Sequence, residues 1–393
     1  MAGNDLSERL QKLWEEYVAA EREKKYPNIM LLGISGAGKS SLVNTIFGIE
    51  VAKVSDTAPE TEGYSNFYDG HDYNRKINLI DTAGYEMDQS GSYLENIQKA
   101  TEQEYGGIPV TVLWYCLSIS NERIEPIDLR IIKHLNSQKE IRDKLCIVLT
   151  HCDEDDNQSS RENSFKEVLR SNGLAGIQKF SVSTDEDLPL ELNDLIQWSA
   201  DKIQDEDFRA SFIGSQMADL RLKEKEAAKC VDLTCAKVGS QKFVDILIDE
   251  DGVDILAEYQ FKMITQVYSI YGIDCLEGII TGVKTGNIIR ISDKIVELLC
   301  ELFPHYQSAI RYLGVLFASL ITKAIGAAIC RLCYSYVERH IHGEVIDAED
   351  FFTDDENNGI IADLFNALTN LATNGLDSFI QKWFKQNVEK KEK

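Results

Sequence analysis

The sequence predicts a three-layer α/β domain with a mostly parallel sheet, preceded by a helix and followed by an all-helical domain. Short apolar runs of strand length alternate with helix-like segments between residues 28 and 205, which is typical of such a sheet. After residue 205 the strand-like runs stop and only helical patterns remain. We therefore expect an N-terminal amphipathic helix over 1–27, the α/β domain over 28–205 and the helical domain over 206–393.

The N-terminal helix is predicted from the spacing of its apolar residues. Leu6, Leu10, Leu13 and Tyr17 repeat at helical intervals, and Pro27 ends the segment. The apolar stripe is expected to pack on the helical C-terminal region.

Six strands are predicted in the α/β domain, at 29–34, 64–69, 76–80, 110–116, 145–150 and 178–182. The second and third should form a hairpin, because the residues between them are turn-like. The fourth and fifth are apolar almost throughout, as central strands covered on both faces are. Helices are expected between the strands, at about 40–47, 92–105, 126–137, 161–171 and 189–203.

The C-terminal region is predicted to be helical over 206–229, 241–250, 253–271, 292–302, 305–340 and 359–387. Its most apolar stretch, residues 312–336, is interrupted by Lys323 and Arg331. The longest uncharged part is too short to span a bilayer, which takes about 18 or more apolar residues. A core helix of a bundle is the favoured interpretation, and a membrane-associating hairpin is the alternative.

The composition limits the location and the partners. The 393 residues include 41 Lys and Arg against 65 Asp and Glu, a net charge of −24, so no nucleic-acid partner is expected. Nine cysteines, an odd number spread over a large chain, indicate free thiols in a reducing compartment. With no apolar signal segment in the first residues, we expect a cytoplasmic protein, with peripheral membrane association as an alternative.

A phosphate-binding loop is the strongest motif. Gly33-Ile-Ser-Gly-Ala-Gly-Lys-Ser40 matches G-x-x-x-x-G-K-[ST], with an apolar strand before it and a helix after it. Backbone N–H groups of such a loop face the phosphates, and the helix N-terminus favours their negative charge. The predicted nucleotide contacts are Ser35, Gly36, Ala37, Gly38, Lys39, Ser40 and Ser41. Lys39 is expected at the β- and γ-phosphates and Ser40 on Mg²⁺.

A second motif, Asp81-Thr-Ala-Gly84, follows the strand at 76–80. A carboxylate at this position can bind a water molecule that coordinates Mg²⁺. The Gly84 N–H can donate a hydrogen bond to the γ-phosphate, and loss of that bond on hydrolysis would release the loop. Its position about 40 residues after the phosphate-binding loop strengthens the assignment.

Thr150-His-Cys-Asp153 ends the strand at 145–150, and here the sequence resembles the TRAFAC GTPases. The resemblance implies that Asp153 pairs with the N1–H and 2-amino group of guanine, which would set base identity. Thr150 stands where Asn is commoner, and His151 where a Lys usually covers the base.

The resemblance also implies roles for three further segments. Between the phosphate-binding loop and Asp81, a switch threonine should bind Mg²⁺, and Thr61 is favoured over Thr57. After the last strand, Ser183 and Thr184 lie where backbone N–H groups touch guanine O6. Tyr85 replaces the glutamine of Ras-type proteins, so Glu86 or a partner group is expected to position the attacking water. Arg123 is a candidate arginine finger that would approach the phosphates.

Overall the chain is similar to Era-like GTPases over 28–205, and Leu113-Trp-Tyr-Cys116 with Arg123 and Asp128 resembles one branch that carries a C-terminal helical domain. The architecture also resembles the immunity-related GTPases by analogy. These resemblances imply a GTP- and GDP-binding switch that hydrolyses GTP slowly, is stimulated by a protein effector or by a homodimer through the α/β domains, and needs Mg²⁺. The alternative is a nucleotide-gated scaffold or membrane-associating, self-assembling protein with little turnover.

Cys330-x-x-Cys333 with His340 and His342 resembles a zinc pattern in spacing only. Ligands on one uninterrupted helix cannot surround a metal, so core cysteines are the favoured interpretation.

Overall fold

The structure is a computed structural model. It describes residues 12–13, 15–17, 19–20, 23–48, 65–70, 76–82, 90–155, 159–185, 188, 190–240, 252–273, 307–347 and 351. The chain divides into two compact units, Lys24–Leu222 and Met1–Glu23 together with Lys223–Lys393. Each is described by itself.

The first unit is built on a six-stranded sheet in the order β2-β3-β1-β4-β5-β6. The strands are β1 (Asn28–Leu32), β2 (Ser65–Tyr68), β3 (Asn78–Thr82), β4 (Val110–Ser118), β5 (Leu145–Thr150) and β6 (Gln178–Ser181). Only β2 runs antiparallel to its neighbour, so the predicted hairpin with β3 and the mostly parallel sheet are both confirmed. Strand β3 begins two residues later than predicted and includes Asp81.

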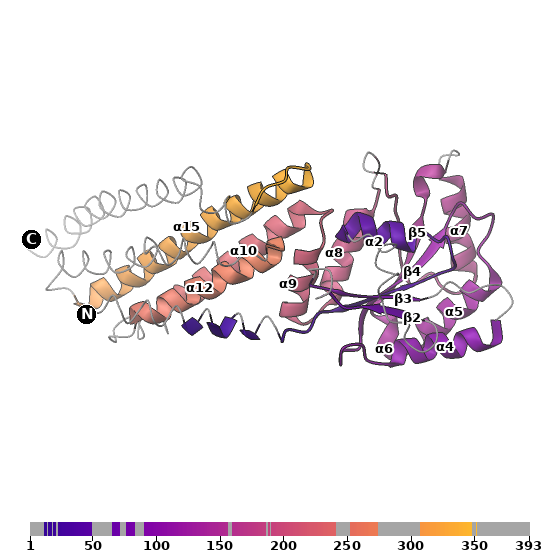
Figure 1. Cartoon of the computed structure of the whole chain (residues 1–393), viewed down its shortest axis with the longest axis horizontal. Coiled ribbons are helices and arrows are strands. Elements are labelled where there is room, and N and C mark those ends of the chain that lie inside the picture. Colours follow the sequence, from indigo (N-terminus) through magenta and orange to yellow (C-terminus); the bar gives the residue numbers. More distant parts are fainter. Residues whose placement is uncertain are drawn as a thin grey trace, which may run out of the picture. The chain divides into compact units, whose positions relative to one another are not determined.

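Helices cover both faces of this sheet (Figure 1). The helices are α2 (Lys39–Phe47), α4 (Ser90–Glu102), α5 (Pro126–Ser137), α6 (Lys139–Arg142), α7 (Ser160–Ser171), α8 (Leu192–Lys202) and α9 (Glu206–Ser215). One face packs its apolar side chains against α4, α5 and α7. On the other face, Trp114 of β4 stacks on Phe47 of α2 and donates a hydrogen bond to Ser199 of α8. The three-layer arrangement is therefore as predicted.

The segment 206–229 is two helices where the sequence pattern predicts one. Helix α9 ends at Ser215, and α10 (Leu220–Val238) begins after a four-residue break. The break is specified by the buried amide of Gln216, which bonds both the N–H and the carbonyl of Asp219. The compact unit continues to Leu222, so α9 belongs with the sheet although it lies beyond residue 205.

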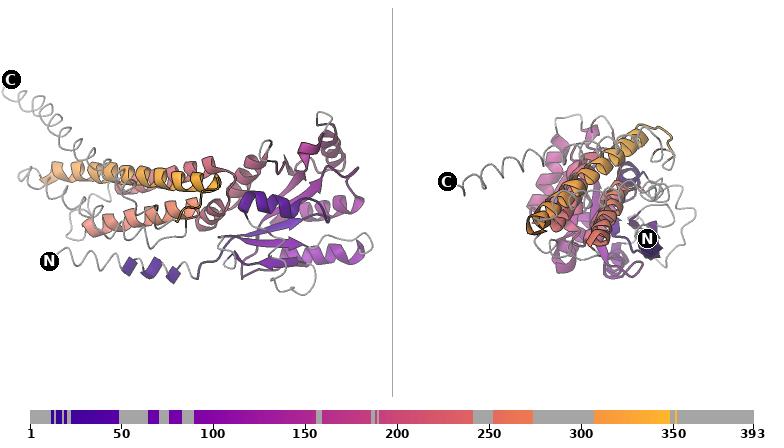
Figure 2. Two further views of the ribbon diagram at one scale, coloured as in Figure 1. Left: turned by 45° about the horizontal axis from the view of Figure 1, so that its top comes forward. Right: turned by 90° about the vertical axis from the view of Figure 1, so that its left-hand side faces the viewer.

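The second unit contains most of α10, α12 (Gly252–Tyr271) and α15 (Gln307–Ile341), which run beside one another (Figures 1 and 2). A Cβ added to Gly326 of α15 would lie 2.5 Å from Val231 of α10, so these helices pack closely. Gln260 of α12 donates to Thr322 of α15 at 3.1 Å. The predicted helices at 253–271 and 305–340 are found, and those at 241–250, 292–302 and 359–387 lie outside the described residues.

Described residues of the N-terminal segment between 12 and 20 are helical, and the ring of Tyr17 meets Phe261 of α12 edge to face. The predicted packing of this segment on the helical region is present at that contact. Among the described residues, no helix combines the length and apolar character needed to cross a membrane.

Candidate functional site

The predicted site residues that the structure describes lie where the parallel strands end. In the sheet, strand β1 lies between β3 and β4. The strands β2 and β3 lie on one side of β1, and β4, β5 and β6 lie on its other side, so the strand order reverses at β1. In open α/β sheets, ligands bind at the carboxyl ends of the strands at such a switch point. The phosphate-binding loop follows β1, Asp81 is the second-last residue of β3, and Thr150 ends β5.

The phosphate-binding loop is fixed by its first glycine and its lysine. Gly33 has φ 137°, and a Cβ there would lie 2.4 Å from the carbonyl oxygen of Cys116 in β4, so no other residue fits. Lys39 is buried, and its ammonium donates to the carbonyls of Gly33 at 3.0 Å and Ile34 at 3.2 Å. The loop thus curls around the Lys39 ammonium.

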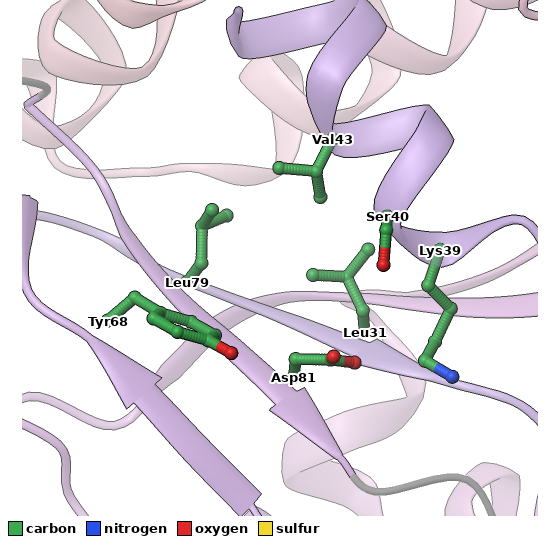
Figure 3. Close-up of a pocket in the computed structure, with 7 residues that line it drawn as sticks. All are labelled: Leu31, Lys39, Ser40, Val43, Tyr68, Leu79 and Asp81. Atoms are coloured by element: carbon green, nitrogen blue, oxygen red, sulfur yellow. The ribbon is translucent and has the colours of Figure 1, made fainter. Parts of the chain in front are cut away.

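A pocket beside this loop contains the two proposed Mg²⁺ ligands that the structure describes. Figure 3 shows the Ser40 hydroxyl and the Asp81 carboxylate facing the same space, with the Lys39 ammonium beside them. One Asp81 oxygen, Oδ1, is buried without a hydrogen-bond partner. Burial raises the pKa of this carboxyl, and the charge of Lys39 opposes the shift.

These donors fit a magnesium ion. A carboxylate and a hydroxyl are hard oxygen ligands of the kind that Mg²⁺ prefers. Burying Oδ1 of Asp81 without a hydrogen-bond partner costs free energy, and a cation bound to this oxygen would offset that cost.

The segment after β5 is bonded to the phosphate-binding loop. Thr150 Oγ1 donates to the carbonyl of Ala37 at 2.9 Å. A Cβ on Gly38 would lie 3.1 Å from Cε1 of His151 and 3.2 Å from Thr150. Thr150 and His151 therefore lie directly against the phosphate-binding loop.

His151 adopts an unusual backbone conformation, with φ 59°. A left-handed conformation is uncommon for a residue other than glycine and costs about 1–3 kcal/mol, and such residues cluster at functional sites. Its Nδ1 lies 3.0 Å from the hydroxyl of Ser118 and 3.1 Å from that of Thr150. Ser118 was not singled out in the sequence, although a polar residue ending a central strand is a recognisable signal.

Asp153 and the loop after β6 complete this edge. Asp153 lies in a 3₁₀ turn, Cys152–Glu154, and is exposed, so its carboxylate is accessible to a base. Ser183 is buried and accepts the N–H of Asp185 at 2.9 Å, whereas Thr184 is exposed. The two loops are joined, because the N–H of Cys152 donates to the carbonyl of Val182.

The remaining predicted residues are not brought together by the described structure. Thr57, Thr61, Gly84, Tyr85 and Glu86 lie outside the described residues. The candidate finger Arg123 is largely exposed, and its Nε donates to Glu125 at 3.2 Å.

Comparison with known proteins agrees with this geometry. Residues 28–151 match the family described as 50S ribosome-binding GTPase. A translocase of chloroplast 34 homolog from Chlamydomonas reinhardtii is 30% identical over 140 residues, 33% of this chain and 35% of that protein. A probable GTP-binding protein EngB from Aquifex aeolicus is 40% identical over 60 residues, 15% of this chain and 31% of that protein.

The chain spans about a third of the length of these curated relatives. Among solved structures, Toc33 from Arabidopsis thaliana in complex with GDP and Mg²⁺ is 20% identical, and the match covers 51% of this chain and 93% of that chain with a TM-score of 0.33. The matched residues, 28–151, contain the phosphate-binding loop and five of the six strands of the sheet.

Proposed function

We propose that the protein is a guanine-nucleotide switch that binds GTP and hydrolyses it to GDP and phosphate. The observation that carries this proposal is the hydrogen bond from Thr150 Oγ1 to the Ala37 carbonyl, with His151 lying against Gly38. This contact supports the proposal, because a base-reading segment at Thr150–Asp153 would lie beside the phosphate-binding loop and one nucleotide would reach both. The family match of residues 28–151 supports the same activity.

Each part of the nucleotide has a proposed partner. The N–H groups of residues 35–41 and the Lys39 ammonium bind the phosphates, and the Asp153 carboxylate pairs with the two donors of guanine. The loop with Ser183 and Thr184 bounds the base on its other side. Ser40 and Asp81 hold Mg²⁺ together with Thr61, and the ion supplies positive charge that neutralises the phosphate oxygens.

We propose that turnover by the isolated protein is slow. Arg123 is engaged by Glu125, which holds its guanidinium in a surface ion pair. In the proposed mechanism Glu86 or a partner group orients water, and the Gly84 N–H senses the γ-phosphate. A protein effector, or a homodimer through the GTPase domains, would then raise the rate.

We place the domain among the Era-like GTPases on the motifs of residues 28–205, and the segment from Leu113 to Asp128 points to one branch of them. The architectural likeness to the immunity-related GTPases is weaker. The seven cysteines of the described residues are free thiols, which supports a cytoplasmic location. The net charge of −24 favours a basic protein partner over nucleic acid, and peripheral membrane association is a further proposal.

Base recognition is tested by Asp153→Asn. The variant replaces an acceptor of the guanine donors by an amide, so we expect GTP affinity to fall at least about tenfold and xanthosine triphosphate to bind better than GTP. Titration with fluorescent nucleotides measures both. Glu154→Gln, which removes the neighbouring charge in the same turn, should keep the preference for GTP. Unchanged GTP affinity in Asp153→Asn would contradict the assignment.

A further inference from the structure

The segment Ser215–Asp219, which we call the connector, joins α9 to α10. Its residues are buried or half-buried, and the side chain of Gln216 is fully buried. Loops with polar backbone usually lie at the surface, because buried backbone groups need partners. The hydrogen-bond partners of the connector therefore identify the elements that hold it in place.

The connector is hydrogen-bonded to α2, which begins with proposed phosphate and metal ligands, and to Lys76, just before the strand that carries Asp81. The N–H of Met217 donates to the carbonyl of Ile46 at 2.7 Å, in the last turn of α2. That carbonyl lacks a partner within its own helix, as all carbonyls of a last turn do. Helix α2 begins at Lys39 and Ser40, so the connector holds the far end of the helix that contacts phosphate.

The second attachment leads to Asp81. Ser215 Oγ accepts the N–H of Lys76 at 2.9 Å, and both residues are buried. Lys76 lies two residues before β3, whose second-last residue is Asp81. In addition, Phe212 of α9 packs edge to face on Phe47 of α2. A shift of α2 or β3 therefore displaces the connector or breaks a buried hydrogen bond.

The other end of the connector starts α10. Gln216 bonds the N–H and the carbonyl of Asp219, each at 2.8 Å, which fixes the turn. Asp219 Oδ1 then accepts the N–H of Leu222 at 2.9 Å and caps the new helix. The start of α10 is thus fixed by Gln216 and Asp219 of the connector, whose Met217 bonds α2.

Helix α10 continues through residue 238, beyond the first unit. Its Lys223 is buried, and the ammonium donates to the carbonyls of Ile270 and Tyr271 at the end of α12, at 3.4 and 3.3 Å. A cation at a helix C-terminus is favoured by the helix dipole. One turn after its cap, α10 therefore holds a second helix of the second unit.

We propose that the connector transmits the nucleotide state of the GTPase site to α10 and to the end of α12, with Ser215, Gln216 and Asp219 as positioning residues. The proposal rests on the proposed function and names the route by which the helical region responds. Movement of α2 and β3 on exchange of GDP for GTP changes the capping turn of α10, and Lys223 passes the change to α12.

Hydrogen exchange of the full-length protein tests this route. The wild type is loaded with Mg²⁺ and either GDP or a non-hydrolysable GTP analogue, and binding of both is measured separately. We expect exchange rates of amides in 220–238 and 265–273 to differ at least about threefold between the two states. Ser215→Ala removes the bond to Lys76, and we expect it to reduce that difference to less than about half. The matched control is Ser211→Ala in α9, because the Ser211 hydroxyl is buried without a hydrogen-bond partner and its loss breaks nothing.

A second pair of variants keeps the test independent of folding. Asp219→Ala loses the cap and should reduce the difference, whereas Asp219→Asn retains a capping side chain and should restore it. Equal exchange in the two nucleotide states of a wild type that binds both nucleotides would overturn the transmission route and leave the proposed function standing. Equal effects of Ser215→Ala and Ser211→Ala would also overturn it. Failure to bind guanine nucleotide would overturn the proposed function and this inference together.

Discussion

Thr150 and His151 are the residues at which the two halves of the proposed nucleotide site meet. The Thr150 hydroxyl donates a hydrogen bond to a carbonyl of the phosphate-binding loop. His151 has a left-handed backbone conformation and lies against Gly38. Strain of this kind persists only where the surroundings enforce it. The hydroxyls of Ser118 and Thr150, both within 3.1 Å of His151 Nδ1, are those surroundings.

Thr150→Val should weaken nucleotide binding more than it harms the fold. Valine has the same shape, but the Ala37 carbonyl loses a donor worth about 1 kcal/mol, so we expect GTP affinity to fall about three- to tenfold. Isothermal titration and thermal unfolding measure the two effects. Thr101→Val is the control, because that hydroxyl donates only within α4 at 3.0 Å. Equal GTP affinity in the two variants would contradict the role of Thr150.

Residue roles were predictable from sequence where a motif names the atoms. The phosphate-binding pattern identifies Lys39 and Ser40, because its spacing reflects one backbone geometry. Ser118 was missed, since its contact with His151 depends on the alignment of β4 with β5 and not on local sequence. Gln216 was missed for a related reason: a polar residue within a helical pattern gives no sign that its side chain closes a turn.

At the scale of elements, α5 is held to β4 through a buried carboxyl. Asp128, in the first turn of α5, is 2% exposed and accepts the hydroxyl of Tyr115 at 2.6 Å. Burial raises the pKa of Asp128 to about 6, although the hydrogen bond from Tyr115 opposes the shift. The folded protein therefore binds this proton more tightly than the unfolded chain does.

This carboxyl should make stability fall as the pH rises. Its folded pKa of about 6 exceeds the model-peptide value of 3.8, so its contribution is fully present below pH 3.8 and is lost as the pH rises through 6. Asp128→Asn removes the titration. From pH 4 to pH 7, we expect the unfolding free energy of the variant minus that of the wild type to increase by about 2–3 kcal/mol. Urea unfolding of both proteins across that range measures it, and a constant difference would contradict the account.

Most elements of the first unit were predictable, because strands that are apolar throughout and amphipathic helices alternate clearly there. The predicted bounds of β5 and α5 agree with the structure. The short helix α6 and the break between α9 and α10 were not predicted. Helix α6 has four residues, too few for a period to show, and the break depends on side-chain hydrogen bonds of Gln216 and Asp219.

At the scale of the whole molecule, the helical region has its own core and its own polar contacts. Ser319 of α15 donates to the Cys235 carbonyl, and Cys230 of α10 contacts Gln266 of α12. These bonds tie α10 to both of its neighbours in the second unit. A change that enters α10 at its cap is therefore shared by three helices rather than absorbed in one.

Assembly should govern the rate of hydrolysis. If a second copy or an effector supplies the group that positions water or neutralises charge, the turnover number of the pure protein should rise with its concentration. We expect a rise of about tenfold or more across the range in which sizing detects dimers with a GTP analogue. Phosphate release at several protein concentrations measures it. Fast hydrolysis that is independent of concentration would contradict the proposed slow intrinsic turnover.

The central claim is that one site at the ends of the parallel strands binds a guanine nucleotide. Titration of the purified full-length protein with GTP and with ATP, each with and without Mg²⁺, tests it most directly. The account predicts that GTP binds at least about a hundredfold more tightly than ATP, because only guanine offers two donors to the Asp153 carboxylate, and that Mg²⁺ strengthens binding. Equal affinity for the two nucleotides, or binding of neither, would contradict it.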